Sequence, residues 1–331
     1  MSAPGPKNLI TDVAGISVGC SEDTHIKTGT TVILPTSAAI AAVTVAGGGP
    51  GTRDTDLLRA DNLVEAVDAI VLSGGSAFGL GAADGVLARL KAADRGYGFG
   101  GKTRQPGVPL PPIVPTAILY DLANGGDKGW DGIAPYAELG AAAYDAAGTV
   151  FQLGRSGAGY GARAGQHQGG LGSASIVTDD GITVGALAAV NCFGSVYMPG
   201  TKAFWAWPYE VNDEYGGVHP PANYSADAED WGDAKLNPQP GQNTTIACIA
   251  TDVTLTVGQA KRVAQMALSG FSRAIRPVFA PFDGDAVFVL STGRIPLPEP
   301  APMALARLGE LAAGTLARAV ARGVYEAREK D

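Results

Sequence analysis

The residues with the clearest chemical potential stand where a Pro- and Gly-rich loop meets an apolar strand. Asn243 is followed there by Thr244, and the segment 244–256, TTIACIATDVTLT, reads as a strand. If Thr244 attacked the preceding carbonyl and the resulting ester were hydrolysed, its freed α-amine would lie beside its own hydroxyl. Such an amine has an ordinary pKa of about 7.7–8.0, so it can act as a general base without a histidine. The junction therefore predicts a self-cleaving precursor with Thr244 as nucleophile, although a turn leading into a strand has the same composition.

Two further motifs carry polar side chains that could serve such a nucleophile. Asp283 and Asp285 flank one glycine just before the apolar segment 286–292. Paired carboxylates there could orient an ammonium group, hold a hydroxyl or bind a cation, and a solvated turn is the alternative. Asn191 ends the apolar segment 182–191, where its side-chain amide could stabilise an oxyanion or merely cap its neighbours.

The segments that must position these residues alternate between strand and helix patterns. β-branched or apolar runs bounded by turn residues predict strands over 30–34, 38–47, 69–73, 182–191, 244–256 and 286–292, with one more ending near Tyr120. Apolar residues at helical spacing predict helices from after Ser76 to a C-cap at Gly96, and over 136–148, 257–275 and 303–327. Because this alternation is typical of an α/β fold and no linker divides the chain, we expect a single domain over residues 1–331.

The segment 205–242 differs in composition from its surroundings. It holds three of the four tryptophans, many prolines, and seven acidic residues against one lysine. We interpret it as a long exposed loop that could shape the entrance to a substrate site.

Composition and charge exclude several classes of protein. A formal net charge of −8 argues against nucleic acid or an anionic membrane as a primary partner, because both select for basic patches. No signal peptide is visible and no apolar run reaches the ~18 residues of a membrane span, so we expect a cytoplasmic protein. The cysteines and histidines are too widely spaced for a disulfide framework, a zinc site or another histidine-based metal site. They are Cys20, Cys192, Cys248, His25, His167 and His219.

Two glycine-rich matches to nucleotide-binding patterns lack the required context. Residues 96–103 match G-x-x-x-x-G-K-T but follow a helix and run into a Pro-rich segment, which cannot supply the phosphate-binding helix. Residues 157–162 resemble a dinucleotide fingerprint without its strand and helix. An NTP-binding function through Lys102 therefore remains only a distant alternative. The absence of G-x-S-x-G argues against an ordinary α/β-hydrolase.

Taken together and in this order, the motifs resemble the family of L-aminopeptidase/D-Ala-esterases, which also contains β-aminopeptidases, a pantetheine hydrolase and the 6-aminohexanoate-oligomer (nylon-oligomer) hydrolase. The similarity extends over almost the whole chain. The segments that carry it are ITDVAGISVG, VLSGGSAFGL, VPTAILYDL, GGLGSAS, the Asn243-Thr244-Thr245-Ile246 junction and DGDAVFVLST.

The resemblance implies a four-layer αββα sandwich of the N-terminal-nucleophile type. It implies a precursor that cuts itself between Asn243 and Thr244 into an α chain, 1–243, and a β chain, 244–331, which stay together in a homo-oligomer of αβ heterodimers. No cofactor and no metal are expected. Thr244 would be the nucleophile of both reactions and Asn191 would help to stabilise the oxyanion.

The same resemblance assigns supporting roles and shows two departures. Asp283 and Asp285 would position Thr244 and its amine, and Tyr120 would line the substrate pocket. Relatives often carry a lysine in or just after the Gly-rich stretch, where this chain has Gln166 and Gln168. The Asn-Thr junction is more similar to that of the nylon-oligomer and pantetheine hydrolases than to the Gly-Ser of many peptidases.

Two hypotheses from different classes follow. The first is an amide hydrolase acting through Thr244 on small peptides or linear amide oligomers such as 6-aminohexanoate oligomers, with an L-aminopeptidase/D-esterase or β-aminopeptidase as the alternative. In this hypothesis the acidic residues would bind the amine-bearing end of the substrate. The second is a non-catalytic αββα protein that binds an amine-bearing small molecule and leaves the bond before Thr244 uncut.

Overall fold

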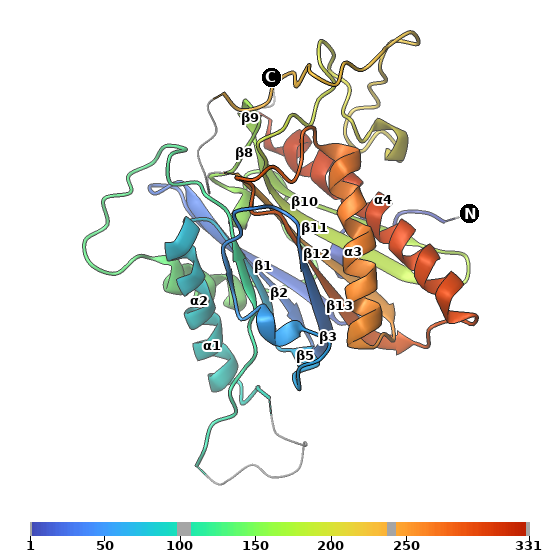
Figure 1. The fold of residues 1–331 in the computed structure, drawn as a ribbon. Helices are drawn as coiled ribbons and strands as arrows, with labels where there is room; N and C mark the ends of the chain where they lie inside the picture. Colours follow the sequence, from blue (N-terminus) through green and yellow to red (C-terminus); the bar gives the residue numbers. More distant parts are fainter. Residues whose placement is uncertain (1, 98–106, 237–242, 329–331) are drawn as a thin grey trace.

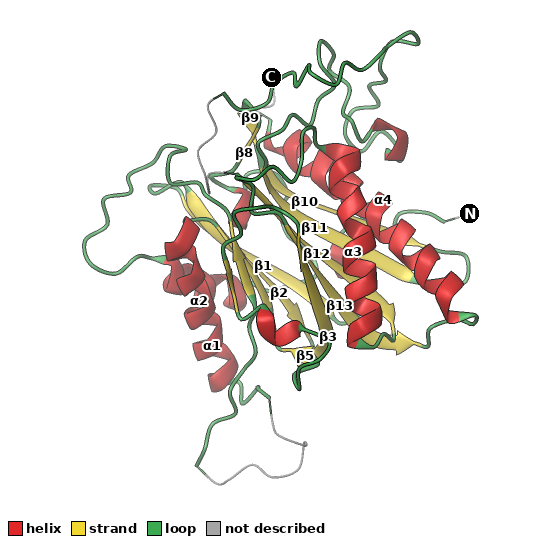
Figure 2. Ribbon diagram, viewed as in Figure 1, coloured by secondary structure: helices red, strands yellow, loops and turns green. Residues whose placement is uncertain are grey.

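The molecule is built in four layers, with two sheets packed face to face and helices on both outer faces (Figure 2). The computed structural model describes residues 2–97, 107–236 and 243–328. Helices α1 and α2 cover one sheet, and α3 and α4 cover the other (Figure 1). The α/β fold with αββα layers expected from the sequence is therefore confirmed.

Within the described ranges, the strands form two large sheets and one small one. The five-stranded sheet has the order β1-β2-β6-β7-β4, from β1 (Ile16–Asp23), β2 (Thr28–Pro35), β6 (Ile70–Ser73), β7 (Thr116–Ile118) and β4 (Thr52–Arg53). The six-stranded sheet has the order β10-β11-β12-β13-β3-β5, from β10 (Gly170–Val177), β11 (Thr183–Asn191), β12 (Thr244–Val253), β13 (Ala286–Ile295), β3 (Ala39–Val45) and β5 (Ala66–Val67). The small sheet pairs β8 (Arg163–Ala164) with β9 (His167–Gln168).

Apolar side chains fill the three spaces between the four layers. One cluster lies between the sheets and includes Ile33, Leu187 and Phe288. A second joins the six-stranded sheet to α3 (Val257–Ala274) and α4 (Ala301–Ala327). A third joins the five-stranded sheet to α1 (Ala82–Ala92) and α2 (Tyr136–Asp145). Burial on both faces explains why the central strands read as continuous apolar runs rather than as alternating patterns.

One expected helix boundary is wrong, and one expected strand is short. Helix α1 ends at Ala92 with Ala93 as its C-cap, so Gly96 does not cap it. The strand expected to end near Tyr120 is short and covers only Thr116–Ile118. The preceding prolines lack the N–H groups that a longer ladder requires.

The neighbours of β12 decide which residues meet at its start. Strand β11 runs antiparallel to β12, and Asn191 is the Cα partner of Thr244. Strand β13 runs parallel to β12, with Ile246 opposite Ala286. The end of β11, the start of β12 and the turn before β13 therefore lie at the same end of the six-stranded sheet.

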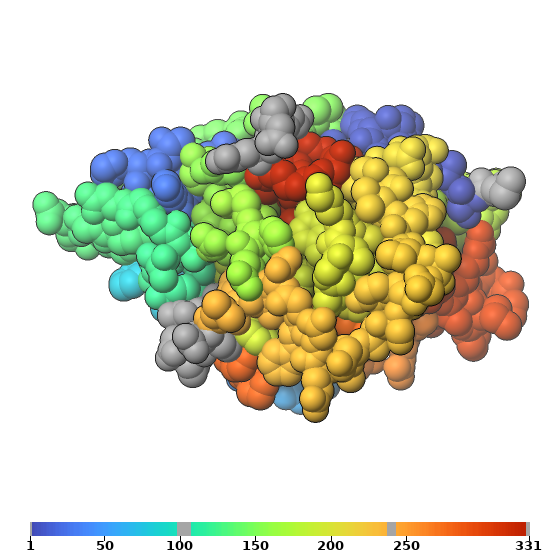
Figure 3. Space-filling view, turned by 90° about the horizontal axis from the view of Figure 1, so that it is seen from above, coloured from blue at the N-terminus to red at the C-terminus, as the bar shows by residue number. Residues whose placement is uncertain are grey.

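The described part of the segment 205–242 covers a broad part of this end of the molecule, where it is drawn in yellow (Figure 3). Many of its residues are exposed, but Ala206, Tyr215 and Ala234 are buried. Tyr215 donates a 2.7 Å hydrogen bond from its hydroxyl to Ala206 O.

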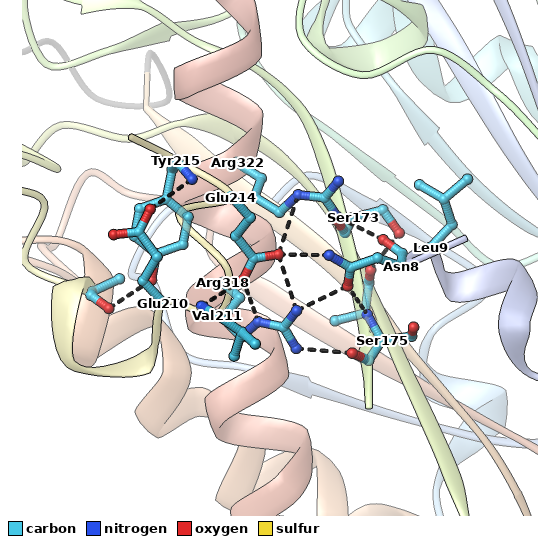
Figure 4. A network of polar contacts seen from close by, with 12 residues as sticks. Asn8, Leu9, Ser173, Ser175, Glu210, Val211, Glu214, Tyr215, Arg318 and Arg322 are labelled. Carbon is cyan, nitrogen blue, oxygen red and sulfur yellow. Dashed lines mark hydrogen bonds and ion pairs between the residues drawn. The ribbon is translucent and has the colours of Figure 1, made fainter. Parts of the chain in front are cut away.

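A buried ion pair ties this segment to the rest of the domain (Figure 4). The Glu214 carboxylate accepts from Arg318 of α4 at 2.9 Å and from Asn8 Nδ2 at 2.6 Å. Arg318 also donates to Ser175 O of β10 at 2.8 Å. The side chains of Arg318 and Glu214 are only 4% and 7% exposed, so water screens their attraction little.

Two segments on which the sequence analysis placed expectations lie outside the described residues. Residues 98–106, which include Lys102 of the phosphate-loop match, and residues 237–242 of the segment before Asn243 lie outside the described ranges. None of the helices in the described ranges is both long enough and apolar enough to cross a membrane.

Candidate active site at the start of strand β12

Thr244 is the first residue of β12, opposite Asn191 at the end of β11 and close to the start of β13. It is 2% exposed, and Asn243 before it is fully buried. The Thr244 hydroxyl donates a short hydrogen bond to the carbonyl oxygen of Asn243. The Thr244 hydroxyl is therefore held next to the Asn243 carbonyl group, which is the group it would attack in self-cleavage.

Gly284 completes the surroundings of this carbonyl. Its backbone N–H donates a 2.9 Å hydrogen bond to Asn243 O, within a bridge between Asn243 and Asp283. A Cβ atom at position 284 would lie 2.6 Å from Thr244 Oγ1, so only glycine leaves room for the hydroxyl. An N–H aimed at a carbonyl oxygen can stabilise the negative charge that develops there during nucleophilic attack.

Asp285 lies on the other side of Gly284 and is fully buried. Its carboxylate accepts from the backbone N–H of Thr245 at 2.6 Å and from that of Phe279 at 3.3 Å. Burial raises the pKa of this carboxyl, and the charge of Asp283 raises it further. Asp285 therefore fixes the backbone directly after Thr244.

Asp283 is 1% exposed and accepts from Ala280 N–H at 3.0 Å through Oδ2. Its Oδ1 is buried and has no hydrogen-bond partner among the described residues, as is the case for both side-chain polar atoms of Asn243. Burial raises the pKa of Asp283, whereas the hydrogen bond from Ala280 N–H and, after it, the ammonium of Lys235 lower the pKa. A buried acceptor without a partner is suited to receive an amine.

Asn191 ends β11 beside Thr244 and is fully buried. Its Nδ2 donates to Tyr120 O at 3.0 Å, and its Oδ1 accepts from Arg163 N–H at 2.9 Å. The structure thus brings the backbone of Tyr120 to Asn191 and fixes the orientation of the Asn191 amide. Tyr120 itself is half-buried.

Lys235 is a residue near the site that the sequence analysis did not single out. Its Nζ donates to Asn191 O at 3.1 Å. Burial lowers the pKa of Lys235 to about 8, against the opposing effects of Cys192 and Asp283. The only available signal was its position as the single lysine among the seven acidic residues of 205–242.

Of the two Gly-rich segments that matched nucleotide-binding patterns, the one at residues 157–162 begins beside β2. Gly157–Gly159 forms a buried 3-10 helix, and Ala158 N–H donates to Thr31 Oγ1 at 3.0 Å. Across the described ranges, no group of three or more His, Cys, Asp or Glu side chains is arranged to hold a metal ion.

Comparisons with known proteins agree in pointing to one group of hydrolases. A family model described as Peptidase family S58 matches residues 8–331. An uncharacterized aminopeptidase of Mycobacterium tuberculosis is 41% identical over 343 residues, covering 97% of this chain and 94% of the relative. The 6-aminohexanoate-oligomer endohydrolase of Kocuria sp. is 28% identical, over 89% of this chain and 78% of that enzyme.

A solved structure extends the similarity to the fold. The L-aminopeptidase D-Ala-esterase/amidase of Ochrobactrum anthropi, described as a variant of the Ntn hydrolase fold, superposes with a TM-score of 0.68. The match covers 98% of this chain and 87% of the other at 20% identity, so it shows the fold alone.

Proposed function

This chain belongs to peptidase family S58, and on that premise we propose that it is an amide hydrolase that activates itself by cutting between Asn243 and Thr244. The freed Thr244 would then act as the catalytic nucleophile. The observation that carries the proposal is the placement of the Asn243 carbonyl between the Thr244 hydroxyl and the Gly284 N–H.

Self-cleavage would proceed in two steps, formation of an ester and its hydrolysis. Thr244 Oγ loses its proton and attacks the carbonyl carbon of Asn243, and the peptide nitrogen of Thr244 leaves as an amine that takes up this proton. Water then hydrolyses the ester, which leaves a carboxylate on Asn243 and a free hydroxyl and amine on Thr244. The Gly284 N–H stabilises the oxyanion of the first step.

Hydrolysis of a substrate would reuse the same groups. The Thr244 amine takes the proton of its own hydroxyl while the oxygen attacks the substrate carbonyl, and the departing amine then receives that proton. Gly284 N–H and Asn191 stabilise the oxyanion in this proposal, Asp285 holds the backbone after Thr244, and water hydrolyses the resulting ester.

The substrates that we propose are small peptides or linear amide oligomers with a free amine, including 6-aminohexanoate oligomers. Asp283 Oδ1, buried without a partner in the described ranges, supports recognition of an amine. An L-aminopeptidase/D-esterase or β-aminopeptidase activity is the alternative, favoured by the higher identity to the mycobacterial aminopeptidase. We further propose a cytoplasmic homo-oligomer of αβ heterodimers.

Intact mass under denaturing conditions, with N-terminal sequencing, tests the proposal. We expect two chains, 1–243 and 244–331, the second beginning TTIACIATD. Thr244→Ala should remain one chain without hydrolytic activity. The matched control is Thr245→Val, because the Thr245 hydroxyl is buried and has no hydrogen-bond partner in the described part of the chain. A wild-type protein that stays uncut after long incubation would instead favour the non-catalytic binding protein.

A further inference from the structure

The segment 231–235 is docked against the small β8–β9 hairpin beside the candidate site. Gln166 donates to Asp233 O from its backbone at 2.8 Å and to Ala234 O from its side chain at 3.3 Å. Gly165 allows this approach, because its φ is +56° and a Cβ there would lie 2.1 Å from Asp233 O. The hairpin therefore holds this part of the segment at a fixed position.

The same segment is also bonded to the chain that follows β11. Lys235 N–H donates to Phe193 O at 2.9 Å, and the rings of Phe193 and Trp231 meet edge to face at 5.9 Å between centroids. These contacts direct the Lys235 ammonium to Asn191 O, 3.1 Å away. Asn191 is the strand partner of Thr244, so the Lys235 ammonium contacts the residue that pairs with the proposed nucleophile.

The Lys235 ammonium is a positive charge in the neighbourhood of the two buried carboxyl groups of Asp283 and Asp285. The titratable or charged groups that face Lys235 are Asp283, Cys192 and Arg163, and Asp283 in turn faces Asp285. Burial raises the pKa of the Cys192 thiol to about 12, so the thiol stays neutral. Two buried carboxylates side by side repel each other, and a nearby cation relieves that repulsion.

We propose that Lys235 is a positioning residue of this active site, which fixes the carbonyl end of Asn191 and brings a positive charge to the turn that carries Asp283 and Asp285. The segment 231–235 is then a part of the catalytic apparatus, because it delivers this charge from outside the two large sheets. The inference rests on the proposed reaction at Thr244.

The test follows self-cleavage of precursor made by cell-free synthesis, across a series of pH values. At pH values on the acid limb of the rate profile, Lys235→Met should cut about tenfold more slowly than the wild type. The acid limb of its rate profile should move to higher pH by about one unit, because losing a nearby cation raises the pKa of Asp283. Lys235→Arg should restore most of the rate and the position of the limb. Lys202→Met, which removes an exposed lysine, should behave like the wild type.

The possible outcomes separate the inference from the proposed function. Wild-type rate and acid limb in Lys235→Met would overturn the role of Lys235 and leave the nucleophile untouched. A Lys235→Arg variant that melts at the wild-type temperature but cuts as slowly as Lys235→Met would also overturn it, because retained charge would then not suffice. A wild-type chain that remains uncut would overturn the proposed function and the inference together.

Discussion

The backbone N–H of Gly284 donates to the carbonyl oxygen of Asn243 at 2.9 Å, and no side chain separates Gly284 from the Thr244 hydroxyl. This contact joins the turn before β13 to the residue before β12. It places a hydrogen-bond donor at the carbonyl group of the peptide bond for which we propose cleavage.

Gly284→Ala should slow self-cleavage by ~100-fold, the size of effect expected when a reacting group is displaced by about 1 Å. The added Cβ would lie 2.6 Å from Thr244 Oγ1 and push the hydroxyl away from its carbonyl target. The fraction of cut chain over time, measured by denaturing gel, checks this. Gly258→Ala is the matched control, because a Cβ there meets nothing within 4 Å. Equal cleavage in both variants would contradict the role of Gly284.

Asn191→Ala should lower kcat for amide hydrolysis by ~10²–10³, the loss typical of one oxyanion donor. The variant also loses the bonds to Tyr120 O and Arg163 N, so the free energy of unfolding should fall by about 1–3 kcal/mol. Steady-state kinetics and urea unfolding measure the two effects separately. Asn62→Ala on the surface should change stability by less than ~0.5 kcal/mol. An Asn191→Ala enzyme with unchanged kcat would remove Asn191 from the mechanism.

Glu214→Ala should lower the free energy of unfolding by ~3–5 kcal/mol, because it leaves the buried Arg318 without its carboxylate partner. Glu310→Ala removes a carboxylate from a comparable arginine pair, but Glu310 is 63% exposed. Its loss should cost at most ~1 kcal/mol. Urea unfolding of both variants in a Thr244→Ala background compares them as single chains. Similar losses in the two variants would show that burial does not distinguish these pairs.

Asp285→Asn should stabilise the protein more at alkaline than at acid pH. Burial and Asp283 raise the pKa of Asp285 above its value of about 3.9 in the unfolded chain. Between the unfolded-state pKa and the raised folded-state pKa, the unfolded chain releases the Asp285 proton before the folded chain does. The free energy of unfolding therefore falls as pH rises through this interval, and the full loss is reached above the raised pKa. Asparagine does not ionise. Urea unfolding of Thr244→Ala with and without Asp285→Asn, at about pH 4 and about pH 8, measures the difference. A difference that shrinks as pH rises would contradict the raised pKa.

The two chains produced by self-cleavage should remain associated without denaturant. Strands β12 and β13 of the second chain occupy the middle of the six-stranded sheet, between β11 and β3 of the first chain. Removing them would expose both sheet edges and the apolar core. Native mass spectrometry should therefore detect one complex where denaturing mass spectrometry detects two chains. Separation of the chains in native buffer would show that these contacts do not suffice.

Sequence patterns located the main elements because their apolar residues repeat locally. Helices α3 and α4 and strands β11, β12 and β13 lie close to the segments predicted for them. Strand β10, Gly170–Val177, was not predicted from periodicity, because its small residues resemble a loop, although the strand packs against α4 and pairs with β11. The prolines before Thr116 limit β7 to three residues, Thr116–Ile118.

The sequence by itself determined the residue types that this chemistry needs: a hydroxyl residue at a loop-to-strand junction, two carboxylates around a glycine and an asparagine ending a strand. Only the tertiary structure decided that they meet, because strand order and register bring Asn191 and the turn at Asp283 to Thr244. No local sequence pattern indicates where Lys235 lies in the fold. Its ammonium reaches Asn191 through long-range contacts to Gln166 and Phe193, which no spacing along the chain encodes.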